Sequence, residues 1–243
     1  MKTCSLTDIG IRREMNQDYF FTSEEPVGNL PNLFIVADGM GGHNAGDFAS
    51  RCAVKTIAET ARTTKLCEFD RILCESITRA NDAVRRYADG HPETMGMGTT
   101  VVAAVLDGQN LTTANVGDSR LYLIGDDIRQ ITEDHSLVQE MVRLGEMDAQ
   151  MAKRHPDRNI ITRAVGADDT VRADIFETEV KPGEWILLCS DGLTNMIEDE
   201  EILEILSGPD DMLSKTEYLI DQANKNGGKD NITVILIDPE LER

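Results

Sequence analysis

Apolar and polar residues alternate along the chain with two different periods. Buried strands are predicted by short, mostly apolar runs at 33–38, 99–106, 111–116, 121–124, 128–131, 187–192 and 232–237. Helices are predicted by apolar residues three and four positions apart at 48–57, 69–87, 202–206 and 212–223. Turn sequences at 107–110 and 125–127 join strand runs as hairpins. Because two helix pairs bracket a hairpin-rich middle, the pattern predicts an α+β sandwich of antiparallel sheets with helices outside.

The segment from about 134 to 174 departs from this alternation. It begins with one helical pattern, whose apolar positions are Leu137, Val138, Met141 and Leu144. A charged stretch with little periodicity follows, and burial cannot anchor such a stretch as it anchors the strands. We therefore expect a peripheral insertion here.

Four aspartates stand at the ends of strand-like runs. Asp38 and Asp191 each precede a glycine at the end of an apolar run, Asp118 lies between two runs, and Asp230 opens the last one. Carboxylates gathered at the rim of one core repel each other unless a multivalent cation lies between them. The pattern predicts a site for hard divalent cations.

Charge and composition narrow the classes of partner. Lys and Arg number 24 against 44 Asp and Glu, and this net charge of −20 disfavours nucleic acid or an anionic membrane as the main partner. No apolar run approaches the length of a bilayer span and the N-terminus lacks the layout of a signal peptide, so a cytoplasmic location is expected. Five cysteines and four histidines show no zinc-ligand spacing.

Six motifs occur in a fixed order: DIGIRREMNQD at 8–18, VADGMGGH at 36–43, MGTT at 97–100, VGDSR at 116–120, CSDG at 189–192 and DN at 230–231. Together they resemble the protein phosphatase 2C family of metal-dependent serine/threonine phosphatases, and DGMGGH resembles the bacterial branch. The resemblance implies a four-layer αββα sandwich of two antiparallel sheets flanked by helices. It also implies a single catalytic domain over residues 1–243, with the insertion at 135–174 as a flap subdomain.

The resemblance further implies ligands for two to three Mn²⁺ or Mg²⁺ ions. Asp38 would bridge two ions, and Gly39 would offer one of them a backbone carbonyl. Asp191 and Asp230 would hold the second ion, and Asp118 with Asp191 would hold the third ion that bacterial relatives often show. Such a centre suits phosphomonoester hydrolysis, because two hard cations acidify the attacking water and screen the phosphate charge.

Arg13 matches the phosphate-binding arginine of the family. A guanidinium donates to two phosphate oxygens at once, which a lysine cannot do. The resemblance makes Arg13, Asp38 and Asp191 the catalytic residues and places Asp18 in the outer shell of the metal site. Gln17 stands where many relatives have Glu and is not expected to bind a metal.

The general acid stays open between three candidates. Eukaryotic relatives have a histidine directly after the Asp-Gly pair, but this chain has Met40 there. The candidates are therefore His43, His155 in the insertion, or a metal-bound water that protonates the leaving group.

The implied function is hydrolysis of phosphoserine and phosphothreonine in proteins by a water that bridges two metal ions, in opposition to a bacterial serine/threonine kinase. The expected partners are phosphorylated proteins and such a kinase, and the expected state is a monomer. Two alternatives remain: a regulatory module that has lost activity, and a calcium-binding protein without catalysis. Arg13 favours the phosphatase, since calcium storage has no use for a phosphate-binding arginine, and the complete set of four aspartates disfavours an inactive module.

Overall fold

Two antiparallel sheets pack face to face in the computed structural model, which describes residues 1–42, 45–153 and 155–241. The first sheet has the strand order β1 (Lys2–Asp8), β11 (Ile232–Asp238), β10 (Trp185–Cys189), β7 (Arg120–Ile124) and β8 (Ile128–Gln130). The second sheet has the order β2 (Asp18–Ser23), β3 (Leu33–Met40), β5 (Val101–Asp107), β6 (Asn110–Val116) and β9 (Asp174–Glu179), and the short β4 (Gly98–Thr99) pairs with β3.

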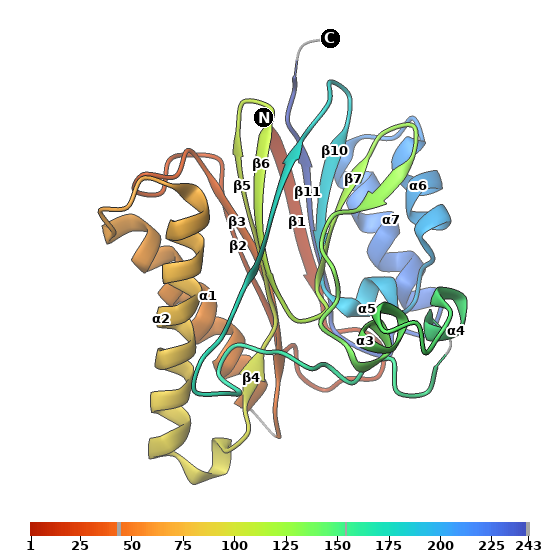
Figure 1. The fold of residues 1–243 in the computed structure, drawn as a ribbon. Coiled ribbons are helices and arrows are strands. Elements are labelled where there is room, and N and C mark those ends of the chain that lie inside the picture. The colour runs from red at the N-terminus through yellow and green to blue at the C-terminus, as the bar shows by residue number, and fades with distance from the viewer. Residues whose placement is uncertain (43–44, 154, 242–243) are drawn as a thin grey trace.

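Helices cover the outer face of each sheet (Figure 1). The β2–β9 sheet carries the antiparallel pair α1 (Ala45–Thr63) and α2 (Phe69–Gly90), after which η1 (Pro92–Thr94) leads back to the sheet. The other sheet carries α6 (Asp199–Ser207) and α7 (Met212–Lys225), with the short α5 (Asp191–Thr194) at its end. The predicted αββα sandwich is confirmed.

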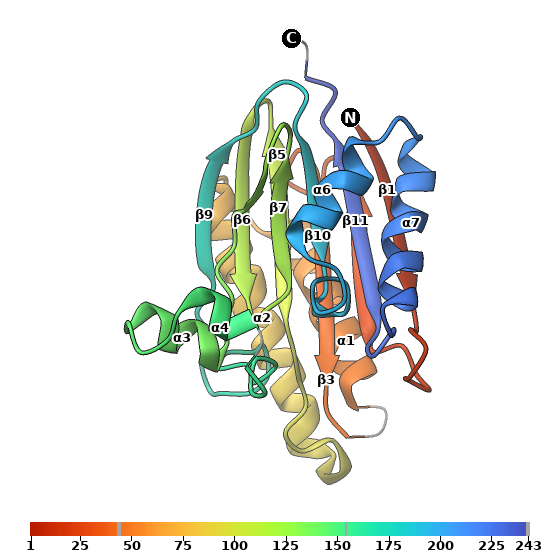
Figure 2. The same cartoon turned by 90° about the vertical axis from the view of Figure 1, so that its right-hand side faces the viewer.

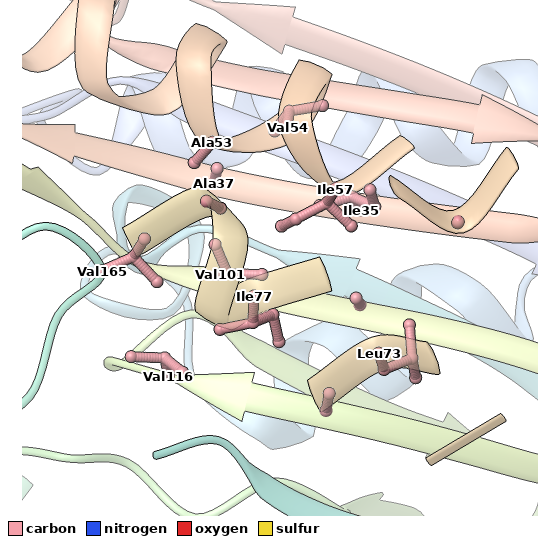
Figure 3. Close-up of a cluster of buried hydrophobic side chains, with 14 of the residues drawn as sticks. Ile35, Ala37, Ala53, Val54, Ile57, Leu73, Ile77, Val101, Val116 and Val165 are labelled. Atoms are coloured by element: carbon pink, nitrogen blue, oxygen red, sulfur yellow. The ribbon is translucent and has the colours of Figure 1, made fainter. Parts of the chain in front are cut away.

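The continuous apolar runs arise because each central strand is buried on both faces. In β3, Ile35 and Ala37 face α1 and α2, whereas Phe34 and Val36 pack against the other sheet. Figure 3 shows the outer cluster, in which Ile35 meets Ile57 of α1. Full burial of a Leu, Ile or Phe side chain contributes roughly 1.5–3 kcal/mol, so these layers hold the strand ends in place.

The structure adds elements that the apolar pattern does not predict. Strand β9 is an edge strand whose sequence, DIFETE, has only two apolar residues among acidic and polar ones, so it forms no apolar run. Strand β2 is also an edge strand. The two Asp-Gly pairs differ, because β3 continues past Asp38 to Met40 whereas Asp191 begins helix α5. The sequence pattern suggested that the first strand ends at its Asp-Gly pair. This expectation was wrong, because β3 continues to Met40.

The insertion contains two short helices, α3 (Leu137–Arg143) and α4 (Ala149–Lys153), which stand beside one end of the sandwich (Figure 2). The chain after them returns to the core. Val165 is fully buried and forms a bridge with Thr99, and the Gly166 amide donates to Asn81 of α2 at 2.7 Å. Residues 162–174 are thus attached to the main body, whereas Leu144, directly after α3, and Met151 in α4 are exposed. Over the described ranges, no helix combines the length and apolar character needed to cross a bilayer.

Candidate metal centre

Asp38 is held at the end of the sandwich by the two threonines of the MGTT motif. Its backbone amide donates to the Thr100 hydroxyl at 2.9 Å, and its carbonyl accepts from the Thr99 hydroxyl at 2.9 Å and the Thr100 amide at 2.8 Å. The backbone at Asp38 is therefore satisfied on both sides within the protein. Its carboxylate can therefore turn to the site, where it hydrogen-bonds the side chain of Asp191.

The glycines after Asp38 and Asp191 permit close approach of another backbone. A Cβ atom on Gly39 would collide with the carbonyl of Gly46 at the start of α1, and one on Gly192 would collide with the carbonyl of Asn231. Glycine at both positions lets each aspartate lie directly against the next segment of the site. This steric reason adds to the role as a carbonyl ligand that the family resemblance implies for Gly39.

Asp118 lies in the loop that crosses from β6 in one sheet to β7 in the other. The Thr100 hydroxyl that accepts from Asp38 also hydrogen-bonds the Ser119 hydroxyl at 2.7 Å, so one threonine links Asp38 to the Asp118 loop. On the other side, Arg120 pairs with Asp134 through contacts of 2.7, 2.9 and 3.1 Å. The loop is fixed on both flanks of Asp118.

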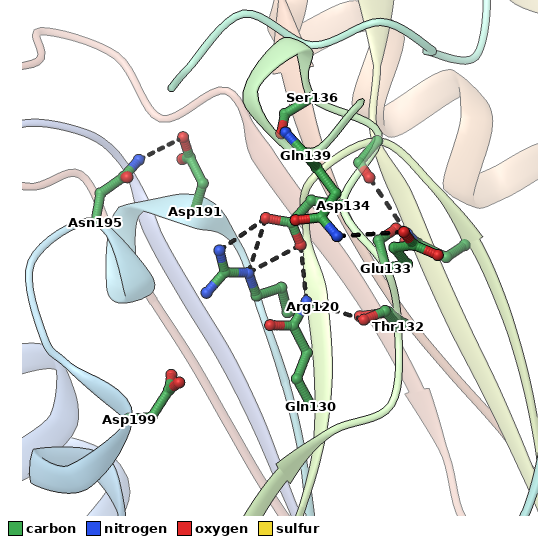
Figure 4. A network of polar contacts seen from close by, with 12 residues as sticks. Arg120, Gln130, Thr132, Glu133, Asp134, Ser136, Gln139, Asp191, Asn195 and Asp199 are labelled. Atoms are coloured by element: carbon green, nitrogen blue, oxygen red, sulfur yellow. Dashed lines mark hydrogen bonds and ion pairs between the residues drawn. The ribbon is translucent and has the colours of Figure 1, made fainter. Parts of the chain in front are cut away.

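Asp191 begins α5, and its Oδ2 atom accepts from Asn195 one turn later at 2.8 Å (Figure 4). A cavity of about 360 Å³ opens between α5 and the insertion, with Asp118 and Asp191 in its wall. The other lining residues include Ser136, Gln139, Arg158, Asn159, Glu198 and Asp199. The cavity therefore connects the acidic cluster to the helices of the insertion.

Asp230 and Arg13 form an ion pair of 2.6 Å at the rim of the site. The neighbouring Asn231 is buried and holds the loop that bears Arg13. Its side-chain nitrogen Nδ2 donates to the backbone carbonyls of Ile9 and Met15, both at 2.9 Å, and its Oδ1 atom accepts from the backbone amide of Gln17 at 2.8 Å. The sequence motif pointed to Asp230 and gave Asn231 no role. Asn231 holds this loop through contacts with residues more than 200 positions away in the sequence, so the local motif could not indicate this role.

Asp18 pairs with Asp38 across β2 and β3 and is almost fully buried. Its Oδ2 atom accepts from the Ser190 hydroxyl at 2.7 Å, which ties β2 to the residue before Asp191. Its Oδ1 atom, like Oδ1 of Asp191, is buried without a hydrogen-bond partner in the protein. Buried carboxylate oxygens in this state call for a cation or an ordered water.

Burial and mutual repulsion shift the acidity of the whole cluster. Burial, followed by the charges of the neighbouring aspartates, raises the pKa of Asp38 well above its ordinary value, and Asp118 is raised in the same way. Burial raises the pKa of Asp18 to about 7 and that of Asp191 to about 6, with Asp230 adding to both. Such a cluster is unfavourable as free anions and favours bound divalent cations.

The donor set fits Mn²⁺ or Mg²⁺, since every candidate ligand is a carboxylate or carbonyl oxygen. Among the described residues, no three Asp, Glu, His or Cys side chains already stand as a metal-holding group. Two of the candidate carboxylates are engaged by other side chains: Asp230 forms an ion pair with Arg13, and Asp191 accepts a hydrogen bond from Asn195. Side-chain rotation would free both, and the orphaned oxygens of Asp18 and Asp191 point to the same use.

The two candidate histidines for the general acid stand differently in the structure. His43 lies outside the described residues. His155 follows α4, where its Nδ1 atom accepts from the Asp157 amide at 3.2 Å. Met40, at the position after Asp-Gly, is the last residue of β3. The choice of acid stays a prediction.

Comparisons with known proteins agree with this architecture. A profile of the protein phosphatase 2C family matches residues 11–236. The serine/threonine phosphatase stp of Listeria innocua is 42% identical over 240 residues, which cover 97% of this chain and 94% of that protein. The crystal structure of the serine/threonine phosphatase Stp1 from Staphylococcus aureus superposes with a TM-score of 0.90 at 35% identity, covering 98% of this chain and 95% of that one.

A further solved structure bears on the metal. The catalytic domain of the serine threonine protein phosphatase PstP, in complex with two manganese ions, has a TM-score of 0.84 at 32% identity and covers 97% of this chain and 96% of that one. The motifs, the sandwich, the oxygen-only donor set and these similarities agree. The chain belongs to the protein phosphatase 2C family of metal-dependent serine/threonine phosphatases.

Proposed function

We propose that this phosphatase holds two or three Mn²⁺ or Mg²⁺ ions with Asp38, the Gly39 carbonyl, Asp118, Asp191 and Asp230. When bound, the ions supply a more acidic water and screen the phosphate charge. Asp18 supports them from the outer shell, where its Oδ2 atom is fixed by Ser190. The observation that carries the assignment is the convergence of four separate chain segments, each with one aspartate, on a partly buried site where the pKa of Asp38 and Asp118 is strongly raised.

Hydrolysis assays with exchanged metals test this proposal. We expect p-nitrophenyl phosphate and a phosphothreonine peptide to be hydrolysed with manganese or magnesium, and expect chelator to stop both reactions. Calcium alone supports binding to oxygen ligands without the same activation of water, so it should give little turnover. Turnover that persists in excess chelator would contradict the assignment, and binding of calcium without any hydrolysis in manganese would favour the calcium-binding alternative.

Arg13 is proposed to hold the substrate phosphate. Its guanidinium is about half exposed and already lies at the rim of the site, in contact with Asp230. An anionic phosphate and a cation-bound Asp230 would together favour exchange of this ion pair for a phosphate contact. Asn231 assists by keeping the Arg13 loop closed.

We expect Arg13→Ala to raise KM for both substrates by roughly ten- to a hundredfold, because hydrogen bonds to a charged group contribute about 1.5–3 kcal/mol. The effect falls mainly on KM, since the guanidinium contacts phosphate in both the ground and the transition state. Inorganic phosphate should also inhibit the variant less. Arg12→Ala, at the adjacent exposed position, is the matched control. If Arg12→Ala shows the larger KM and Arg13→Ala behaves as wild type, the roles are reversed.

The insertion at 135–174 is proposed to act as a flap that selects protein substrates. Support comes from the cavity of about 360 Å³, whose wall joins Asp118 and Asp191 to Ser136, Gln139 and other insertion residues. Because residues 162–174 are attached to α2 and β4, motion would be confined to α3, α4 and the loops around them. Few buried apolar contacts in that part favour local opening.

Deleting 149–157, or the change His155→Ala, should therefore alter phosphopeptide turnover more than p-nitrophenyl phosphate turnover. We expect about a tenfold difference between the two substrates for the deletion, or ~1.4 kcal/mol of transition-state free energy. The small substrate reports the metal chemistry, and the peptide reports contacts along the cavity. Equal losses on both, together with slow amide exchange across α3 and α4, would mark the segment as a rigid part of the catalytic core.

The physiological setting is part of the proposal. We infer that the chain acts as a single domain and a monomer in the cytoplasm, on proteins phosphorylated by a serine/threonine kinase. The five cysteines are free thiols, which suits a reducing compartment. Phosphoproteomes with and without the phosphatase would identify the sites that accumulate phosphate, and the kinase would be the one whose loss reverses that accumulation.

A further inference from the structure

His135 occupies a buried position between β8 and α3, and both of its ring nitrogens are used. Nδ1 lies 3.0 Å from the backbone amide of Gly117, and Nε2 lies 3.0 Å from Oδ2 of Asp174. Because an amide can only donate, Nδ1 must be the unprotonated acceptor. The single ring proton is then on Nε2 and is donated to Asp174.

The bond to Asp174 closes the flap. His135 is the first residue of the segment and Asp174 the last, where β9 begins. The second carboxylate oxygen of Asp174 accepts from Arg163 at 2.8 Å, and Arg163 also donates to the carbonyl of Arg172 at 3.0 Å. Both ends of the flap are therefore joined through one carboxylate.

The contacts with Gly117 link His135 to the residue directly before Asp118 in the candidate metal centre. Gly117 directly precedes Asp118, and its carbonyl accepts from the His135 amide at 2.9 Å and from the side chain of Asn115 at 3.2 Å. His135 thus contacts Gly117 twice, once through its ring and once through its backbone. Gly117 has a φ of +106° and lies so close to Thr100 that a Cβ would not fit, so the position requires glycine. The two bonds from His135 hold this glycine, which no side chain of its own can anchor.

We propose that His135 is a positioning residue that fixes the Asp118 carboxylate through Gly117 and couples it to the flap through Asp174. The inference rests on the assignment of Asp118 as a metal ligand made above. It gives the flap a structural connection to the ion that Asp118 holds. A histidine absent from the recognised motifs thereby acts between the flap and the metal centre.

The charge state of the ring agrees with this geometry. Burial lowers the pKa of His135, so the ring stays neutral at pH 7 and keeps one donor and one acceptor. Burial opposes ionisation of Asp174, but the hydrogen bonds from His135 and Arg163 hold the pKa of that carboxyl below its ordinary value. A neutral donor facing a charged acceptor maintains the tautomer that Gly117 needs.

Two substitutions separate the two ring contacts. The amide of His135→Asn reaches the position of Nδ1 and can still accept from Gly117, but it cannot reach Asp174. The amide of His135→Gln reaches the position of Nε2 and can still donate to Asp174, but it leaves Gly117 without its acceptor. Manganese binding, followed by calorimetry or by the loss of the free-ion electron paramagnetic resonance signal, gives a readout independent of turnover.

We expect His135→Gln to weaken the manganese site that Asp118 holds by about tenfold or more, as is typical when a partner that orients a ligand is lost. His135→Asn should keep that affinity within about twofold and instead raise KM for a phosphopeptide. Asp174→Ala, at a partly exposed position, removes the flap contact of His135 together with that of Arg163, but it leaves the ring in place. The Gly117 amide still requires an unprotonated Nδ1, so this variant should match His135→Asn. Equal loss of manganese in the Asn and Gln variants, or none in either, would overturn the inference.

Asp118→Asn distinguishes this inference from the ligand assignment. If Asp118→Asn loses a manganese site and folded His135→Gln does not, the positioning role is wrong and the assignment stands. If Asp118→Asn keeps every site, the assignment itself is wrong. Melting temperatures identify variants that do not fold. If the His135 variants do not fold, Asp174→Ala provides the test. Unchanged manganese affinity together with an unchanged KM for the phosphopeptide would then exclude coupling between the flap and the Asp118 site.

Discussion

Asp38→Asn and Asp191→Asn are each expected to abolish hydrolysis of both substrates while leaving a folded protein. Each change removes one negative charge from a centre whose cations contribute several kcal/mol to the transition state, so kcat should fall by about a thousandfold or more. The measurement is kcat in saturating manganese. Asp107→Asn, at an exposed hairpin turn, makes the same chemical change outside the site and should have no effect.

The same variants carry a second signature. Because burial and neighbouring charges oppose ionisation of Asp38 and Asp191, a neutral amide should stabilise the metal-free fold. We expect their melting temperatures in chelator to equal or exceed that of the wild type. Near-normal turnover of either variant would overturn the ligand assignment, and a low melting temperature would trace any lost activity to unfolding.

Metal-free protein is expected to lose stability as the pH rises from about 4 to about 7. The folded-state pKa is about 7 for Asp18 and about 6 for Asp191, both above the ordinary aspartate value of 3.8. The folded protein therefore binds these protons more tightly than the unfolded chain, and the stability they contribute disappears once the pH passes the folded pKa. Melting temperatures in chelator across this range provide the measurement.

Manganese should reverse that trend. An ion at 100 times its dissociation constant adds about 2.7 kcal/mol to the free energy of unfolding, and carboxylates bind it better once they are deprotonated. The melting temperature should therefore rise with manganese most strongly near pH 7 and least near pH 5. A melting temperature indifferent to both pH and manganese would show that the acids are not coupled to one another or to an ion.

The sequence marks most of the candidate ligands locally. Asp38, Asp191 and Asp230 adjoin apolar runs long enough to identify buried strands, and glycine follows the first two. What supports them is not local. Thr100 links Asp38 to Ser119 from a different strand, and no periodicity indicates that one hydroxyl serves both. The fold and the candidate ligands could thus be proposed from the sequence, and the fold is confirmed, but the hydrogen bonds that orient the candidate ligands could not be predicted.

The insertion at 135–174 shows the same limit. Its helix at Leu137–Arg143 follows from apolar spacing, but the attachment of Val165 to Thr99 depends on the folded sheet and leaves no period in the sequence. Edge strand β9 was missed because none of its residues is fully buried and only Ile175 and Phe176 are apolar. His135 was missed for a related reason, since its importance comes from Gly117 and Asp174, which lie 18 and 39 positions away.

The acidic cluster draws on both sheets of the sandwich. Asp18 and Asp38 belong to one sheet, Asp191 and Asp230 adjoin strands of the other, and Asp118 lies on the crossing between them. An ion bound by these residues would link the two sheets at this end of the sandwich and would oppose their separation. Separation of the two sheets at this end would therefore also separate the candidate ligands, so a change far from the cavity could abolish metal binding by loosening the packing between the sheets.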